Sequence, residues 1–261
     1  MRWCCRGLAL AMSLAACGPF AGGAEGPAPV AGDRAPTTDG APAPAATMAR
    51  EHAPGGAPPR AAERPRIVIL GDSLTAGLGL PTDEAYPARL QERIDRGGWP
   101  FEVVAAAVSG DTTAGGVRRL AWALDGDVRL LVVALGGNDA LRGLPVGQMR
   151  DNLAAIVDEA ARRGVRVLLA GMEAPPNFGP AYASNFRNVF RNLAASRDLT
   201  FVPFLLEGVA GMPELNQADG IHPNAEGAEG VAAHLWVALE PLLDGLGAEP
   251  SGPPAVIRDR P

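Results

Sequence analysis

Short apolar runs alternate with amphipathic stretches along residues 66–246. Each run is rich in Val, Leu, Ile, Phe or Ala and has the length of a buried strand. Several are apolar almost throughout, which is typical of strands covered on both faces of a sheet. The runs predicted as strands are 66–70, 101–108, 128–135, 165–170 and 199–203.

Helices are predicted between these strands. The clearest one places Leu153, Ile156, Val157 and Ala160 on one face and ends at Gly164. Because strands and helices alternate, right-handed crossovers predict an α/β fold with a parallel sheet covered on both faces. The other helices begin near Pro87, cover 113–124, contain 186–193, and include Val231, Leu235 and Leu239.

The N-terminal segment has the pattern of an export signal. Arg2 and Arg6 precede an apolar run, 8–16, that is too short to span a bilayer. Residues 14–17 read Leu-Ala-Ala-Cys and resemble the bacterial lipobox, so we expect a lipidated Cys17. Such an anchor predicts a membrane-bound lipoprotein facing the periplasm or the cell exterior. The alternative is an ordinary secreted protein in which this cysteine is not acylated.

Composition divides the chain into four predicted parts. Residues 18–65 consist mainly of Ala, Pro and Gly without apolar periodicity, so they cannot bury enough surface to offset chain entropy. We therefore predict a signal peptide at 1–16, a lipidated cysteine and disordered tether at 17–65, one folded domain at 66–246, and a disordered tail at 247–261.

Charge and residue usage exclude several kinds of chemistry. The formal net charge is -6 and the arginines are scattered, which argues against nucleic acid as a partner. The chain contains no lysine, which excludes a P-loop lysine, a Schiff-base lysine and a Ser-Lys dyad. Its cysteines, Cys4, Cys5 and Cys17, all lie in or next to the signal. Without paired histidines or a G-x-G-x-x-G pattern, we expect no metal and no cofactor. We also expect the protein to be a monomer.

A candidate nucleophile follows the first predicted strand. Gly71-Asp72-Ser73-Leu74 stands where strand turns into helix, so the Ser73 hydroxyl can project from the edge of the sheet. A serine needs a nearby base to become a useful nucleophile. The alternative is that Ser73 only caps the next helix.

The candidate base lies near the other end of the domain. Asp219 and His222 stand three residues apart in the loop Asp-Gly-Ile-His-Pro-Asn, so the carboxylate can accept one imidazole N–H and stabilise the imidazolium. His52 falls in the predicted tether, and His234 falls inside the last helix as a packing residue. The alternative is that His222 is merely a turn residue.

Two further loops carry candidate donors for an oxyanion. Gly110 follows the second strand, where the lack of a side chain lets a backbone N–H approach a ligand. Asn138 follows the third strand and offers two amide donors. With the N–H of Ser73 they would form an oxyanion hole, although these glycines could simply permit tight turns. The flanking residues Asp72, Ser109, Asp111 and Asp139 are interpreted as turn and cap residues.

These motifs together resemble the SGNH/GDSL hydrolase family over roughly residues 66–243. Ser73, Gly110, Asn138 and His222 come in the family's order, and Asp219 matches its D-x-x-H aspartate. The nearest subgroup comprises bacterial exported enzymes of thioesterase, lysophospholipase or arylesterase type. The resemblance implies a three-layer α/β/α sandwich of flavodoxin-like type with about five strands, and hydrolysis through an acyl-serine.

The same resemblance places an apolar loop at 138–149 beside the acyl chain, with Leu141, Leu144 and Pro145 as substrate-binding residues. It predicts an esterase for short to medium acyl or aryl esters, with lysophospholipids and thioesters as further substrates. Two alternatives remain: a deacetylase of cell-envelope carbohydrate, and a non-catalytic lipoprotein that binds the envelope.

Overall fold

A single parallel sheet forms the centre of the domain. The computed structural model describes residues 64–247 of the chain. The sheet has five strands in the order β2-β1-β3-β4-β5, with every pair parallel. The strands are β1 (Arg66–Gly71), β2 (Glu102–Ala107), β3 (Val128–Ala134), β4 (Arg166–Ala170) and β5 (Thr200–Val202).

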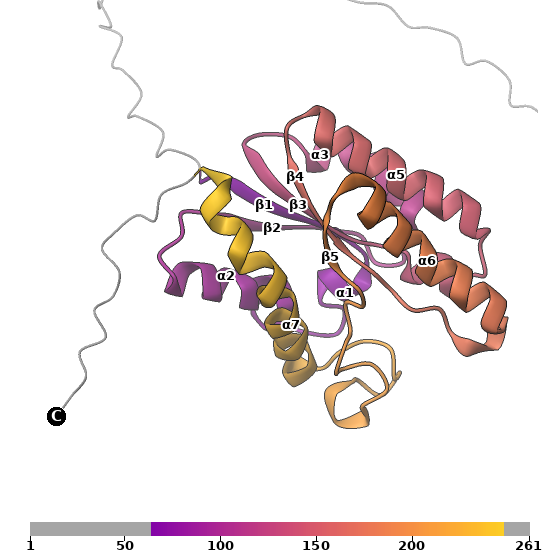
Figure 1. Ribbon diagram of the computed structural model, residues 1–261. Coiled ribbons are helices and arrows are strands. Elements are labelled where there is room, and N and C mark those ends of the chain that lie inside the picture. The colour runs from indigo at the N-terminus through magenta and orange to yellow at the C-terminus, as the bar shows by residue number, and fades with distance from the viewer. Residues whose placement is uncertain (1–63, 248–261) are drawn as a thin grey trace, which may run out of the picture. The chain divides into compact units, whose positions relative to one another are not determined.

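Helices cover both faces of this sheet (Figure 1). On one face lie α3 (Thr113–Ala123), α5 (Val146–Arg162) and α6 (Pro180–Arg197), and on the other lie α2 (Tyr86–Arg96) and α7 (Ala225–Leu243). The predicted three-layer α/β/α architecture is confirmed. The shorter helices are α1 (Ser73–Ala76), α4 (Gly137–Leu141), η1 (Thr82–Glu84), η2 (Pro176–Phe178), η3 (Pro213–Leu215) and η4 (Asp244–Leu246).

The core lies between the sheet and its helices. Side chains of β1 and β3, such as Ile67, Ile69 and Leu131, are fully buried, as the continuous apolar runs predicted. From α6, Phe186 and Phe190 pack edge to face against each other, with ring centroids 5.4 Å apart. Burying one such large apolar side chain stabilises the fold by about 1.5–3 kcal/mol.

Sequence periodicity located the strands to within one residue at each end, but it missed two short helices. α1 and α4 are four and five residues long, and such lengths complete too few turns to show a periodic apolar face. The predicted apolar loop at 138–149 is therefore wrong in part. Its first residues belong to α4, and its last belong to α5, where Met149 is buried.

Both ends of the described chain lie at the amino edge of the sheet, opposite the loops that follow the strands. Glu102, the first residue of β2, donates its N–H to the carbonyl of Pro65. At the other end, Arg166 opens β4 and donates to the carbonyls of Leu242 and Gly245, around the start of η4. The first and last described residues thus both lie near the first residues of the strands.

Several sequence predictions fall outside the described residues. The signal peptide, Cys17, all but the last two residues of the tether and nearly all of the tail belong to the undescribed ends, and their predicted roles stay predictions. No helix within residues 64–247 combines the length and apolar character needed to cross a membrane.

Candidate active site

Ser73 is the first residue of α1, directly after the turn that leaves β1. Asp72 caps this helix, because its carboxylate accepts the N–H of Leu74 at 3.1 Å. The turn is tight, since a Cβ on Gly71 would lie 1.8 Å from the hydroxyl oxygen of Thr75. The end of β1 and the start of α1 therefore set the Ser73 hydroxyl at the carboxyl edge of the sheet, where it is half-buried.

The imidazole of His222 reaches this hydroxyl from a distant loop. His222 Nε2 lies 2.8 Å from Ser73 Oγ, and His222 Nδ1 lies 2.6 Å from Asp219 Oδ2. An ionised carboxylate only accepts hydrogen bonds, so Nδ1 carries the proton and Nε2 is free to accept the one from serine. The three side chains named from the sequence lie in one hydrogen-bonded line.

Backbone groups keep the carboxylate of Asp219 charged. The N–H of His222, its side chain and the N–H of Ile221 all donate to this carboxylate and hold its pKa well below the usual range. The Asp219 side chain is 45% exposed, whereas that of His222 is 14% exposed. The carboxylate therefore works at the solvent boundary, and the imidazole lies beneath it.

The loop carrying this pair is pinned at its base. Asn216 pairs with Pro223 in an isolated bridge, and its side-chain amide donates to the carbonyls of Val209 and Met212 at 2.7 and 2.8 Å. Gly220 takes the left-handed conformation at φ +67 that closes the turn between aspartate and histidine. These contacts present the imidazole from a fixed loop.

Asn138 enters the site from α4. Its Nδ2 donates to Asp72 Oδ2 at 3.0 Å, which fixes the amide end of the side chain toward the nucleophile turn. Asp72 is only 3% exposed, and burial raises its pKa even though Leu74, Asn138 and His222 act in the opposite direction. Sequence reasoning interpreted Asp72 only as a cap. The contact with Asn138 joins residues 66 positions apart and leaves no local pattern.

Gly110 lies in the loop after β2, the neighbour of β1 in the sheet. It takes the left-handed conformation at φ +81, and its carbonyl accepts a hydrogen bond from Arg142 at 2.8 Å. Asp139 supports the same edge from below, because its buried carboxylate accepts both the N–H and the hydroxyl of Thr113. α4 and α3 are thereby tied together beside the candidate oxyanion donors.

A cleft of about 430 Å³ opens beside Ser73 and His222. Of the residues predicted to bind substrate, Leu141 lines the cleft, and Leu144 and Pro145 are not among its lining residues. The Leu144 carbonyl instead accepts the Tyr182 hydroxyl, and Pro145 precedes the first turn of α5. The cleft is lined by Asp72, Ser73, Leu74, Gly137, Asn138, Leu141, Met172, Glu173, Ala174, Pro175, Pro176, Phe204, Leu206, Ala210, Gly220, Ile221 and His222.

Most of the apolar wall was missed by sequence reasoning. It comes from the segments after β4 and β5, which contribute Met172 and Phe204 among others. The rule that ligands gather at the carboxyl ends of parallel strands could have found both segments. The wall is apolar enough to bind a hydrocarbon chain, and Ser73 lines the same cleft.

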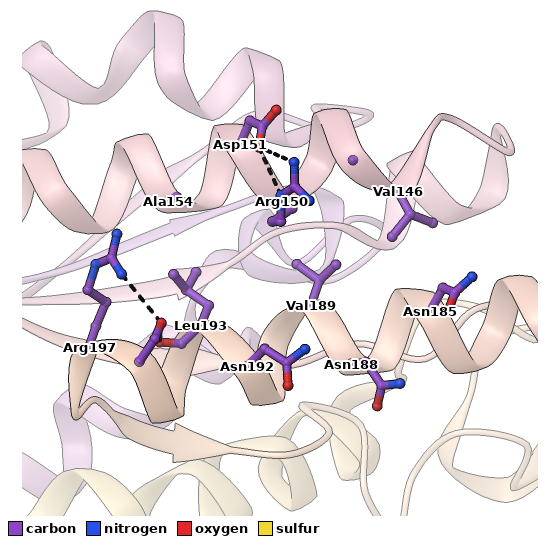
Figure 2. A pocket seen from close by; sticks show the side chains of 12 residues that line it. Val146, Arg150, Asp151, Ala154, Asn185, Asn188, Val189, Asn192, Leu193 and Arg197 are labelled. Carbon is purple, nitrogen blue, oxygen red and sulfur yellow. Dashed lines mark hydrogen bonds and ion pairs between the residues drawn. The ribbon is translucent and has the colours of Figure 1, made fainter.

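A larger groove, of about 600 Å³, lies between α5 and α6 (Figure 2). Asn185, Asn188 and Asn192 line its α6 side, and an ion pair between Arg150 and Asp151 lines its α5 side. Its lining residues include neither a histidine nor a paired nucleophile. The volume of a cavity therefore does not identify the reactive site here, because the smaller cleft holds Ser73 and His222. Across residues 64–247, no three His, Cys, Asp or Glu side chains come together as metal ligands.

Comparison with known proteins identifies the family. Residues 69–229 match the model of the GDSL-like Lipase/Acylhydrolase family. The chain belongs to this family. It is accordingly a serine ester hydrolase of the GDSL/SGNH type, as its motifs predicted.

Three relatives illustrate the likeness. Esterase TesA of Pseudomonas aeruginosa is 43% identical over 68% of this chain and 89% of its own. Thioesterase 1/protease 1/lysophospholipase L1 of Escherichia coli K12 is 35% identical over 71% of this chain and 88% of its own. The crystal structure of the psychrotrophic esterase EstA from Pseudoalteromonas, inhibited by monoethylphosphonate, is 30% identical with a TM-score of 0.66, covering 69% of this chain and 98% of that one. The GDSL fold thus accounts for nearly the whole length of these relatives.

Proposed function

We propose that this GDSL hydrolase cleaves carboxylic esters of apolar acyl or aryl groups, with Ser73 as nucleophile, His222 as general base and Asp219 as the carboxylate that orients the imidazole. The observation that carries the proposal is the 2.8 Å contact between Ser73 Oγ and His222 Nε2, in line with the 2.6 Å contact to Asp219. A neutral Nε2 at that distance can take the hydroxyl proton as the oxygen attacks.

Two steps complete the reaction. In the first, Ser73 Oγ bonds to the acyl carbon, its proton passes to His222 Nε2, and the carbonyl electrons move onto oxygen. The tetrahedral intermediate collapses, the bond to the leaving alcohol breaks, and the imidazolium returns its proton to that alcohol. In the second, water attacks the acyl-serine with the same base, releasing the acid and the free hydroxyl. Asp219 stays ionised throughout, because its pKa is held low.

Three donors are proposed to hold the oxyanion: the N–H groups of Ser73 and Gly110 and the side-chain amide of Asn138. One amide hydrogen of Asn138 is committed to Asp72, which leaves the second for the substrate. Each such donor stabilises the transition state by about 3 kcal/mol. Within residues 64–247 the N–H of Ser73, in the first turn of α1, has no hydrogen-bond acceptor, so it can donate to an anion.

The apolar wall supports an acyl or aryl substrate. Leu141, Met172, Phe204, Leu206 and Ile221 offer hydrocarbon surface, whereas a carbohydrate chain would need more polar partners than this wall provides. The wall therefore favours acyl esters over acetylated cell-envelope sugars. Lysophospholipids and thioesters are proposed as further substrates, in keeping with the names of the relatives.

A fluorophosphonate probe tests the proposal. It forms a covalent adduct only with an activated serine, and the inhibition of EstA by monoethylphosphonate makes the same class of reagent suitable here. We expect the unaltered enzyme to be labelled, Ser73→Ala to be unlabelled, and Ser184→Ala, an exposed serine on α6, to be labelled normally. A folded, unlabelled wild-type protein would contradict the proposal and favour a binding role.

We also propose that the enzyme is exported, and that Cys17 carries a lipid anchor outside the cytoplasm. The signal-like residues 1–16 and the Leu-Ala-Ala-Cys segment support this. Growth with an alkyne-tagged fatty acid, followed by gel detection, should label the wild type and not Cys17→Ser. Labelling of both, or release of the wild type in soluble form, would contradict anchoring at this cysteine.

A further inference from the structure

Arg119 of α3 connects the end of β1, the end of β2 and the loop that contains Gly110. Its Nη2 donates to the Gly71 carbonyl at 2.6 Å, and its Nη1 donates to the Ala106 carbonyl at 2.6 Å. Its Nε donates to Asp111 Oδ2 at 2.7 Å. The guanidinium thus engages three acceptors through three nitrogens, and its side chain is only 14% exposed.

Two of the acceptors lie at the ends of strands and the third in the loop after β2, next to the groups that the proposed chemistry needs. Gly71 ends β1 and stands two residues before the nucleophile. Ala106 lies in β2, and Asp111 directly follows Gly110, the proposed oxyanion donor. One side chain therefore links the strand that presents Ser73 to the loop that presents the N–H of Gly110.

The loop is built around this contact. A Cβ on Gly115 would lie 2.0 Å from Asp111 Oδ1, so only the absence of a side chain lets α3 approach the carboxylate this closely. Arg142 also binds the loop, through the Gly110 carbonyl, but its side chain is exposed and makes a single contact there. Arg119 is the more extensive support, because its planar guanidinium and Nε hold three acceptors in fixed directions, whereas Arg142 holds one.

We propose that Arg119 is a positioning residue that sets the distance between the Ser73 turn and the Gly110 N–H, and so the geometry of the oxyanion hole. The inference rests on the proposed function. Oxyanion donors act when they lie about 2.7–3.1 Å from the developing anion. A shift of the loop should therefore weaken transition-state stabilisation more than it weakens substrate binding.

The test compares Arg119→Met and Arg119→Lys with Arg118→Met. Arg118 is the exposed neighbour on the same helix and forms no hydrogen bond or ion pair among the described residues. Kinetics are measured on p-nitrophenyl butyrate and on its thiono analogue, whose sulfur accepts hydrogen bonds poorly. Melting is followed by circular dichroism.

For Arg119→Met we expect kcat on the oxygen ester to fall by about 10²-fold, the size of losing one oxyanion donor, with KM nearly unchanged. The preference for the oxygen ester over the thiono ester should shrink. Arg119→Lys should lose less, because it keeps the charge, and Arg118→Met should match the wild type.

Unchanged kcat in a folded Arg119→Met, or an unchanged oxygen-to-sulfur preference, would overturn the inference. Should Arg119→Met fail to fold, Asp111→Asn cuts the same link more gently and must shift the preference in the same direction. Normal fluorophosphonate labelling of the wild type alongside either negative result would leave the proposed function standing and sink this inference alone.

Discussion

The imidazole Nε2 of His222 lies 2.8 Å from the hydroxyl oxygen of Ser73, across 149 positions of sequence. Because this nitrogen takes the serine proton, His222→Ala should lower kcat by about 10⁶-fold, as the loss of a triad base does in other hydrolases. Steady-state kinetics on p-nitrophenyl butyrate measures the loss, and circular dichroism should show an unchanged melting temperature. His234→Gln is the matched control, since that histidine bonds to a backbone carbonyl and should keep most of the activity. A loss of only a few-fold in His222→Ala would rule out its role as the base.

Removing the charge of Asp219 should also slow turnover. Asp219→Asn presents an amide to Nδ1 and misorients the imidazole, which costs up to about 10⁴-fold in other triads. The carboxylate is 45% exposed, so solvent takes over part of its role, and we expect a loss of about 10²–10⁴-fold. The measurement is kcat at neutral pH with Asp151→Asn, an exposed aspartate of α5, as control. Wild-type turnover in Asp219→Asn would contradict the assignment.

The lowered pKa of Asp219 predicts how acid affects stability. A carboxylate whose pKa is lower in the folded protein than in the unfolded one stabilises the fold above the unfolded pKa, about 4. That contribution is lost as the pH falls toward the folded pKa. The melting-temperature advantage of the wild type over Asp219→Asn should thus be present above about pH 5 and shrink as the pH falls below about 4. An advantage that grows as the pH falls below about 4 would have the wrong sign.

The contact between Asp72 and Asn138 predicts a pair of related losses. Asn138→Ala removes one oxyanion donor and should lower kcat by about 10²–10³-fold. Asp72→Asn keeps a single acceptor oxygen for two donors, the Leu74 N–H and Asn138 Nδ2, so the hold on Asn138 weakens and kcat should fall in the same direction. Asn188→Ala, an exposed residue of α6 that lines the other groove, serves as control. If the double variant loses no more than Asn138→Ala alone, the two residues act through one contact; simple multiplication of the losses would show independence.

Chain-length preference should follow the observed wall of the cleft. Ile221 lines the cleft and is 46% exposed, so Ile221→Ser should shift the preference toward shorter acyl chains. Leu144 does not line the cleft, so Leu144→Ser should leave the preference alone. A series of p-nitrophenyl esters from acetate to dodecanoate measures both. The reverse outcome would indicate that the acyl chain binds beside the loop after α4 instead.

The fold was predictable because its signals are local. Each strand lies in a mostly apolar run, and α5 shows its buried face at regular spacing. Ser73, Asp219 and His222 could also be predicted, because each stands in a polar segment beside an apolar element, and strand-end loops of a parallel sheet converge.

The contacts that support the site could not be predicted from the sequence, for a physical reason. The Asp72–Asn138 and Arg119–Gly71 hydrogen bonds join residues 66 and 48 positions apart, and only the packed fold brings them together. Arg119 looks like any arginine on a polar helix face until the strand ends are placed beneath it. The residues that line the cleft were only partly predictable, because beside Leu141 of α4 much of the apolar lining comes from the segments after β4 and β5.

The described chain enters and leaves at the amino edge of the sheet, whereas the cleft opens at the other edge, a strand length of roughly 20 Å away. A support or fusion partner attached at either end would leave the mouth of the cleft unobstructed. An enzyme held at a bilayer through its N-terminal side could bind dissolved esters without changing its orientation to the membrane. If the proposed anchor at Cys17 holds the enzyme at a bilayer, the cleft edge would have to turn toward the membrane to reach an ester embedded there.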